Sequence, residues 1–209
     1  MATSSTNDQS HSTPATVTRS LSPGIYAPIP TFFQLESEDL GQWYFSDAED
    51  VLIKGRTDLD AFEKHILQTA LAGVRPLLSG SMSEAIHLSH AERSTLIKTA
   101  RKVLDNAGLD KVPIVSGIGA GSTRECIEFA NEAADSGADC AIAICSGYFA
   151  GALAGNKKAL KAFWTEISQK SLIPVMIYNC KRSARIYDIR LTCSSCRRSW
   201  SCGRDQSGF

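Results

Sequence analysis

Short apolar segments that alternate with amphipathic helices dominate the pattern of this chain. Five such segments begin near residues 25, 74, 112, 140 and 173, and several of them, such as CAIAIC and IPVMIY, are apolar on both faces. Strands of this kind are typical of a parallel sheet buried on both sides. The stretches between them show helical spacing of apolar residues. The pattern therefore predicts an α/β fold in which helices cover a parallel sheet.

Helical spacing places four helices between the expected strands, and capping or stop signals mark three of them. Ser89 and Glu92 form a capping box, in which each side chain bonds the backbone N–H of the other residue. Ser122 and Glu125 repeat this pattern before the next helix, and Gly73 is a stop signal. Five strands and four helices are thus expected over residues 24–179. The 209 residues of the chain fall short of the roughly 250 typical of an eight-stranded α/β barrel.

Two segments do not fit the repeat. Residues 1–23 contain eleven Ser and Thr and no apolar block, so we expect a disordered leader and no secretory signal. A single arginine there argues against a mitochondrial transit peptide, and we expect a cytoplasmic protein. The connection from Phe33 to Asp58 is much longer than the usual roughly 2–6 residues. Because removing residues 41–57 restores a short connection, we predict an insertion there, with a translated intron as one origin.

Charge and cysteine content exclude several classes of partner. The chain has 22 basic and 22 acidic residues, but residues 180–209 hold seven of the basic and two of the acidic ones. The acidic remainder argues against nucleic acid as the main partner. No apolar run approaches the about 20 residues that cross a membrane. Cys126, Cys140 and Cys145 lie in apolar or helical contexts and are expected as free buried thiols.

Small residues after the second strand form the first candidate site. Gly80, Ser81 and Met82 follow that strand directly, and α/β folds bind ligands at the carboxyl ends of parallel strands. Backbone N–H groups of such residues can receive a ligand carboxylate. Tyr178 ends the fifth strand and Tyr148 follows the fourth. Their hydroxyls could relay protons over the same cavity, although aromatic residues at strand ends often only cover a core.

Three neighbouring features have structural interpretations. Glu84 is expected as a buried, hydrogen-bonded carboxylate. His87 and His90 are expected as solvated residues at a helix start, since no further metal ligands lie nearby. The segment SGIGAGST lacks the last glycine of a dinucleotide-binding fingerprint, so we expect an ordinary strand-to-helix turn there.

Four motifs at successive strand ends resemble those of a known family. They are G-S-x-x-E-x-x-x-L-S-x-x-E-R, G-x-G-x-x-S-T-x-E, an aromatic pair, and P-V-x-I-Y-N. In this order, over residues 24–179, they resemble the dihydrodipicolinate synthase and N-acetylneuraminate lyase family. The segments PTFF and GSMSEA are similar to its fungal branch, which acts on deoxy-hexulosonates or 4-hydroxy-2-oxoglutarate. The resemblance implies a partial TIM (β/α)8 barrel, a homotetramer in the intact family, and a class I aldolase without cofactor or metal.

The resemblance also implies a chemistry and roles for named residues. Family members form a Schiff base between a lysine on strand six and pyruvate or another 2-oxo acid, whose partner is an aldehyde. Gly80, Ser81 and Met82 would hold the 2-oxo acid carboxylate, with Tyr148 nearby. Ser81 would relay protons, and Tyr178 would be the proton shuttle beside the Schiff base.

Three positions depart from the family pattern. Met82 stands where relatives have a second Thr or another polar residue, and Ser83 stands where they have Gly. Phe149 aligns with the second relay tyrosine, while the adjacent Tyr148 keeps a hydroxyl. We therefore expect a weaker grip on the carboxylate and an incomplete proton relay.

The tail, residues 180–209, offers no lysine in a strand like that of the family. Arg190 stands in the lysine position of IRLTC and comes too soon, and arginine stays protonated. A zinc site would need a second C-x-x-C pair, and a nucleic-acid arm would need denser positive charge. We favour a frameshifted or mis-spliced tail and expect a C-terminally truncated, inactive barrel. The alternatives are a condensation of the 4-hydroxy-tetrahydrodipicolinate synthase type and a non-catalytic remnant that binds full-length subunits.

Overall fold

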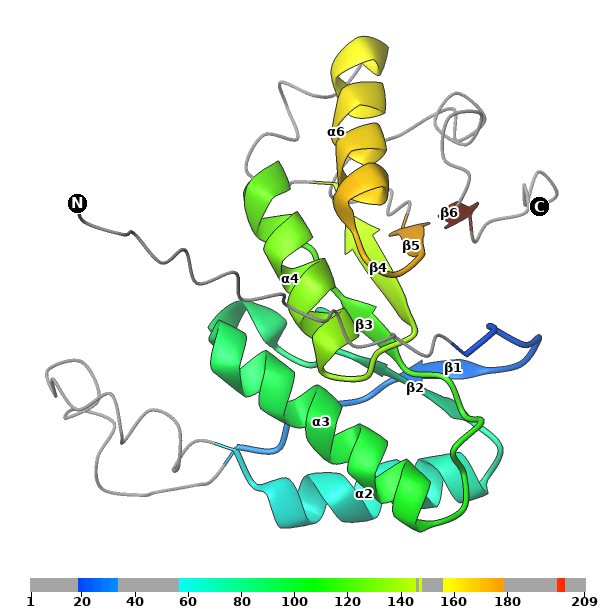
Figure 1. The fold of residues 1–209 in the computed structure, drawn as a ribbon. Helices are drawn as coiled ribbons and strands as arrows, with labels where there is room; N and C mark the ends of the chain where they lie inside the picture. Colours follow the sequence, from blue (N-terminus) through cyan, green and yellow to red (C-terminus); the bar gives the residue numbers. More distant parts are fainter. Residues whose placement is uncertain (1–18, 34–56, 146, 148–155, 179–198, 202–209) are drawn as a thin grey trace, which may run out of the picture.

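The computed structural model describes residues 19–33, 57–145, 147, 156–178 and 199–201 (Figure 1). These residues form one parallel sheet in the order β1-β2-β3-β4-β5-β6. The strands are β1 (Tyr26–Pro28), β2 (Arg75–Leu78), β3 (Val115–Gly117), β4 (Cys140–Ile144), β5 (Val175–Tyr178) and β6 (Ser199–Ser201). The helices are α2 (Leu59–Leu71), η1 (Ala85–His87), α3 (His90–Asn106), α4 (Thr123–Asp135) and α6 (Lys157–Lys170).

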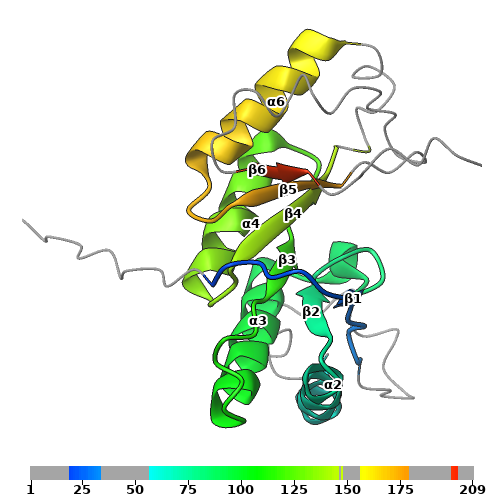
Figure 2. The same ribbon diagram turned by 90° about the vertical axis from the view of Figure 1, so that its right-hand side faces the viewer.

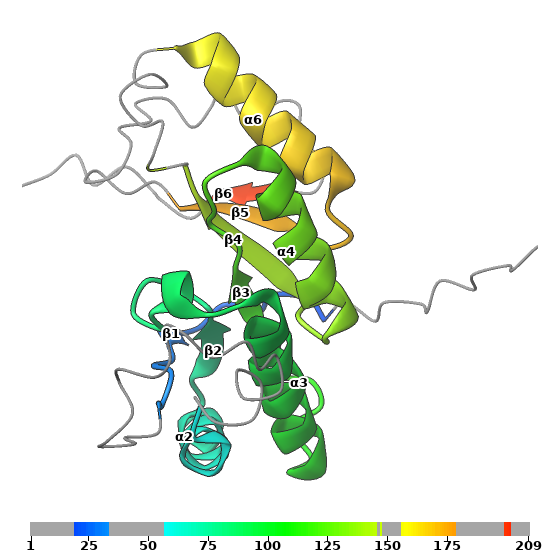
Figure 3. The same ribbon diagram turned by 90° about the vertical axis from the view of Figure 1, so that its left-hand side faces the viewer.

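The strand order follows the chain order, as a barrel requires. Views from opposite sides show the strands in front in Figure 2 and helices α3, α4 and α6 in front in Figure 3, so these helices cover one side of the curved sheet. Successive helices pack against each other, α2 on α3, α3 on α4 and α4 on α6. The predicted five strands and four long helices are therefore confirmed.

The sixth strand was not expected from the sequence. Residues 199–201 of the tail pair in parallel with β5, with Met176 opposite Trp200. The sequence Ser-Trp-Ser lacks the apolar run that identifies a buried strand. Pairing needs only backbone groups, which the outer edge of β5 supplies. The strand contains no lysine.

Helix starts follow the capping signals closely. The Ser89 side chain accepts from the Glu92 N–H, and the Glu92 carboxylate accepts from the Ser89 N–H at 2.8 Å, so the first capping box is complete. At α4 only half of the predicted box is present in the described structure. Ser122 accepts from the Glu125 N–H at 3.1 Å, whereas Glu125 lines a cavity.

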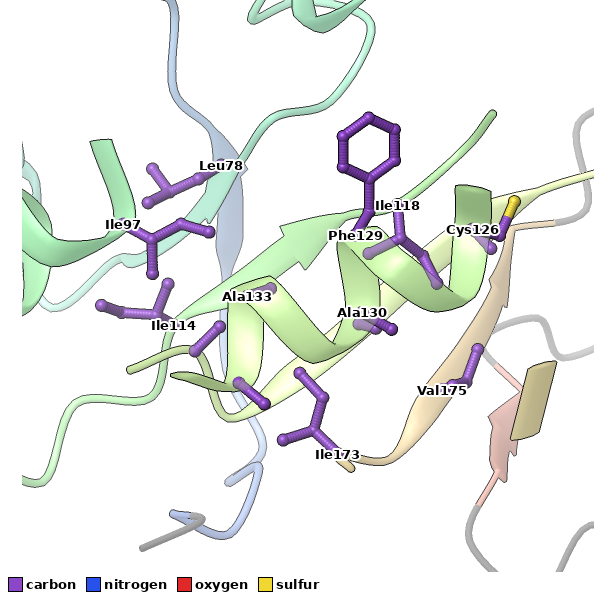
Figure 4. Packing of buried hydrophobic residues seen from close by; sticks show 14 of the residues in the cluster. Leu78, Ile97, Ile114, Ile118, Cys126, Phe129, Ala130, Ala133, Ile173 and Val175 are labelled. Atoms are coloured by element: carbon purple, nitrogen blue, oxygen red, sulfur yellow. The ribbon is translucent and has the colours of Figure 1, made fainter. Parts of the chain in front are cut away.

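The core lies between the sheet and its helices. Figure 4 shows Leu78 and Ile114 from the sheet side close to Ile97 of α3, and Val175 and Ile173 near α4. Trp164 and Ile167 of α6 are almost completely buried. Among the described residues, no helix is both long and apolar enough to cross a membrane.

The amino-terminal end of the sheet is closed by residues from the predicted leader. Asp139 precedes β4, and its side chain is fully buried. Its carboxylate accepts from the Ile114 N–H at 2.9 Å, the Arg19 N–H at 2.7 Å and the Arg19 guanidinium at 3.2 Å. Arg19 also donates to the Asp110 carbonyl. The packed body therefore includes residues 19–23, and residues 1–18 lie outside the described part.

The ends of the long connection between β1 and α2 lie next to each other. Phe33 and Thr57 form an antiparallel bridge, and the Asp58 N–H donates to the Phe32 carbonyl at 2.7 Å. The chain thus leaves and re-enters the described fold at one place. Residues 41–56 of the predicted insertion and residues 180–198 and 202–209 of the tail lie outside the described residues, and their origin stays a prediction.

Candidate functional site at the carboxyl ends of the strands

A cavity of about 900 Å³ opens at the carboxyl ends of the strands. The loop after β2 supplies one wall, residues 79–82, and the loop after β3 supplies Gly119, Ala120 and Gly121. Ile144 of β4 and Tyr178 of β5 also line the cavity. Helices α3 and α4 complete it with His90, Arg93, Glu125 and Phe129. The cavity therefore lies where ligands bind in parallel α/β folds.

The segment Ser79–Ser83, here called the rim loop, is held by a dense set of hydrogen bonds. The Gly80 carbonyl accepts from the N–H of Ser83 at 3.1 Å and of Ala85 at 3.3 Å. The Gly80 N–H donates to the Ser83 hydroxyl at 3.2 Å. In the described structure the N–H groups of Ser81 and Met82 donate to no protein acceptor. Both residues line the cavity, so its wall includes two adjacent backbone N–H groups without a protein acceptor among the described residues.

The start of the rim loop is tightly packed against β3. A Cβ on Gly117 would overlap the Ser79 carbonyl, so only glycine permits this approach of β3 to the end of β2. Ser79 itself has φ 52°, and its buried hydroxyl has no hydrogen-bond partner among the described residues. An unsatisfied buried hydroxyl costs about 1–3 kcal/mol. The fold therefore concentrates strain where the cavity begins.

The structure brings most of the predicted site residues to this cavity. Gly80, Ser81, Met82 and Tyr178 all line it. Met82 is 67% exposed and Tyr178 is 50% exposed, so neither side chain only covers the hydrophobic core. Tyr148 lies outside the described residues, although Gly147 beside it lines the cavity.

A buried arginine on α3 was missed from the sequence. Arg93 donates to the Ala85 carbonyl and lies 3.9 Å from the centre of the Phe129 ring. Its Nε and Nη1 atoms have no hydrogen-bond partner among the described residues. Burial lowers the pKa of Arg93 from its ordinary value, and Glu125 and Glu132 oppose this shift. The cavity thus contains a desolvated cation, which favours an anionic ligand.

Two other expectations for this region need correction. Glu84 is exposed and not buried, because its φ of 52° turns the chain into η1 and its side chain toward solvent. His90 is not simply solvated. It stacks on Phe129 with 4.2 Å between ring centres, and its Nδ1 lies 2.9 Å from Glu132. His87 is exposed, as expected.

The place of Arg93 in the helical pattern did not indicate that its side chain is buried. It follows Glu92 in the first turn of α3, where charged residues are usually solvated. Only the packing of α3 against α4 reveals that this side chain is buried beside Phe129.

The thiols of the body are unsuited to nucleophilic or metal chemistry. Cys126, Cys140 and Cys145 are buried, as predicted. Burial raises the pKa of Cys126 to about 11 and that of Cys140 to about 12. Both therefore stay protonated near neutral pH. Among the described residues, no three His, Cys, Asp or Glu side chains lie close enough to hold a metal ion.

Comparison with known sequences gives a consistent picture. Residues 52–187 match the model of the dihydrodipicolinate synthetase family. The L-threo-3-deoxy-hexylosonate aldolase of Aspergillus niger is 36% identical over 160 residues, which are 76% of this chain and 42% of the relative. A protein of Emericella nidulans named as a probable mitochondrial 4-hydroxy-2-oxoglutarate aldolase is 33% identical over 162 residues, 77% of this chain and 46% of the relative.

Solved structures agree with this assignment. A dihydrodipicolinate synthase family protein from Coccidioides immitis is 27% identical with a TM-score of 0.65, over 85% of this chain and 50% of that chain. The dihydrodipicolinate synthase of Acinetobacter baumannii, crystallised with pyruvate, is 25% identical with a TM-score of 0.58, over 77% of this chain and 46% of that chain. The predicted partial TIM barrel is thus confirmed.

The chain spans about half the length, or less, of the relatives it matches. The family match nevertheless covers most of its described strands and helices, from α2 to β5. By sequence and by fold, this chain belongs to the dihydrodipicolinate synthetase family.

Proposed function

We propose that the rim cavity binds the carboxylate of pyruvate or another 2-oxo acid. The observation that carries this proposal is the pair of unbonded N–H groups at Ser81 and Met82, exposed at a cavity that also contains Arg93. Backbone donors and a nearby desolvated cation together favour a carboxylate over a neutral group.

Hydroxyls on two sides of the same cavity support proton transfer. Ser81 lines it from the rim loop and Tyr178 from the end of β5. By resemblance to the family, Ser81 relays protons and Tyr178 shuttles them beside a Schiff base. Tyr148 completes the substrate-binding set in this proposal.

The catalytic lysine is the missing part of the proposed site. Family members carry it on strand six, and β6 of this chain is Ser-Trp-Ser. An imine needs a lysine made nucleophilic by desolvation, whereas Arg190 cannot form one. We therefore propose that the 209-residue chain binds a 2-oxo acid without aldolase activity, and that its tail is frameshifted or mis-spliced.

Reductive trapping tests this directly. The purified chain is incubated with pyruvate and sodium borohydride, and its intact mass is measured, with an active family aldolase as the positive control. We expect no covalent adduct on the chain. A reduced pyruvate adduct, located on one lysine by peptide mapping, would contradict the proposal.

The similarity to fungal aldolases supports a 3-deoxy-hexulosonate or 4-hydroxy-2-oxoglutarate as the substrate of an intact relative, with a tetramer as the working assembly. Condensation of the 4-hydroxy-tetrahydrodipicolinate synthase type is the alternative. A cytoplasmic location also remains part of the proposal, and microscopy of a C-terminal fluorescent fusion tests it.

A second candidate function is a non-catalytic partner of full-length subunits. Met82 and Ile86, at 67% and 87% exposure, place apolar surface beside the rim, and exposed apolar surface marks many interfaces. Co-purification of the tagged chain with an intact paralogue would support this function. Recovery of the chain alone, as a monomer, would argue against it.

A further inference from the structure

The hydroxyl of Ser83 joins the rim loop to the first strand. It accepts from the Gly80 N–H at 3.2 Å and donates to the Ile29 carbonyl just beyond β1. The Ser83 residue is only 2% exposed. Thr31 strengthens this link, since its hydroxyl donates to the Ser83 carbonyl at 2.7 Å. Two buried hydroxyls thus bridge the rim loop and the segment after β1.

The bridge changes which donors the rim loop can offer. The Gly80 N–H is occupied, and the Gly80 carbonyl already accepts from Ser83 and Ala85. Ser81 and Met82 follow with N–H groups that bond no described residue. With glycine at position 83, the Gly80 N–H would lose its acceptor and become a third donor.

We propose that Ser83 is a positioning residue for the carboxylate. Its hydroxyl accepts from the Gly80 N–H, so this N–H cannot bond the ligand. The N–H groups of Ser81 and Met82 remain as the pair that binds the two carboxylate oxygens. This inference rests on the proposed function of the rim cavity. It reverses the expectation that serine at position 83 weakens carboxylate binding, because the serine holds the loop that carries the two N–H donors.

A titration followed by NMR separates these donors. The 15N-labelled 209-residue chain is titrated with pyruvate, and with pyruvamide as a ligand that lacks the carboxylate. We expect the amide signals of Ser81 and Met82 to shift with pyruvate, those of Gly80 to move little, and pyruvamide to shift none of the three. A Gly80 shift as large as the other two would overturn the proposal, and this result needs no variant.

Ser83→Ala and a matched control, Ser171→Ala, test the bridge itself. The Ser171 hydroxyl also bridges buried backbone, since it accepts from the Ile173 N–H at 3.3 Å and donates to the Ile173 carbonyl at 2.7 Å, but it lies before β5. Both variants should lower the melting temperature to a similar extent. Only Ser83→Ala should speed hydrogen exchange of the Gly80 amide, by about tenfold or more, and add Gly80 to the signals that respond to pyruvate.

The outcomes distinguish the two proposals. If pyruvate shifts no rim amide in the unaltered chain, the proposed function fails, and with it the role of Ser83 in ligand binding. If the rim responds but Ser83→Ala leaves Gly80 exchange and shifts unchanged, only the inference about Ser83 is overturned.

Discussion

The two ends of the parallel sheet differ in how completely their buried polar groups are hydrogen-bonded. At the amino-terminal end, the buried Asp139 carboxylate is bonded by Ile114 and by both the backbone and the guanidinium of Arg19. At the rim, the Ser79 hydroxyl and two nitrogens of Arg93 lack partners among the described residues. Two non-glycine residues with positive φ, Ser79 and Glu84, also lie there. The closed end thus satisfies its buried carboxylate, whereas the rim contains buried polar groups that no described residue bonds.

This contrast agrees with the general division of α/β barrels, in which the carboxyl ends of the strands carry function. Unsatisfied groups and strained backbone persist only where the surrounding structure holds them in place. Here the Ser83 bridge and the Gly117 contact hold the rim loop.

The largest loss of stability is expected at the closed end. Asp139→Ala leaves the Ile114 N–H and the Arg19 guanidinium without their buried acceptor, so we expect a loss of about 4 kcal/mol in unfolding free energy. Glu166→Ala is the control, because that carboxylate is 48% exposed and pairs with Lys170, which is 61% exposed, and such a surface pair contributes about 1 kcal/mol or less. Urea unfolding measures both. Equal losses in the two variants would contradict the role of Asp139 in stabilising the closed end.

At the rim, Gly117→Ala should cost about 2–3 kcal/mol, because the added methyl group overlaps the Ser79 carbonyl. Gly121→Ala, in the loop after β3, is the stability control, since an added Cβ there meets no atom within 4 Å. Thermal unfolding gives the stability of both variants. We also expect Gly117→Ala to displace the rim loop and weaken pyruvate binding. The same stability in both variants would contradict the close approach of the strands.

Two buried thiols, one near each end of the sheet, make the stability of the fold depend on pH. Cys126 contacts the loop after β3 and Cys140 begins β4, with pKa values of about 11 and about 12 against 9.0 for a free thiol. Because each pKa is raised in the folded chain, the contribution of each protonated thiol to the free energy of unfolding is complete below pH 9. This contribution is lost as pH rises through the folded pKa, and each thiol then lowers the free energy of unfolding by about 1.4 kcal/mol for each pH unit.

Urea unfolding between pH 8 and 10.5 checks this dependence. Cys126→Ala and Cys140→Ala should each flatten the decline in stability above pH 9. In the unaltered chain, iodoacetamide at pH 9.5 should modify Cys126 before Cys140, since the closed end desolvates its thiol more strongly. The reverse order of modification would contradict the comparison.

The smallest effect is expected at Glu84, an exposed residue with φ 52°. Glu84→Gly should raise the melting temperature slightly, corresponding to about 0.5–1 kcal/mol, because glycine adopts this conformation without strain. Glu63→Gly, in the middle of α2, should lower stability by about 1 kcal/mol. Destabilisation by Glu84→Gly would show that the side chain has a role that the structure does not reveal.

The regular parts of the fold could be predicted from the sequence. Apolar runs such as residues 140–144 and the Ser89 and Glu92 capping box have local causes, namely burial of both strand faces and bonding within one helical turn. Gly80, Ser81 and Met82 could be placed at the rim because the end of a strand fixes their position.

Features that depend on distant contacts could not be predicted. The Ser83 hydroxyl bonds a carbonyl 54 residues away, and Arg93 is buried only because α4 places Phe129 beside it. The Glu125 half of the second capping box is absent because that side chain faces the cavity. Strand β6 pairs with β5 through backbone groups, and its sequence Ser-Trp-Ser has no apolar run that would have predicted a strand in the tail.

The central claim is that the rim, and not the closed end, receives a 2-oxo acid. The most direct test is a map of pyruvate-induced amide shifts over the whole 15N-labelled chain. We predict shifts at Ser81, Met82 and Tyr178, with the signals of Arg19, Ile114 and Asp139 unchanged. Shifts confined to the closed end, or no shift at the rim at millimolar pyruvate, would contradict the account.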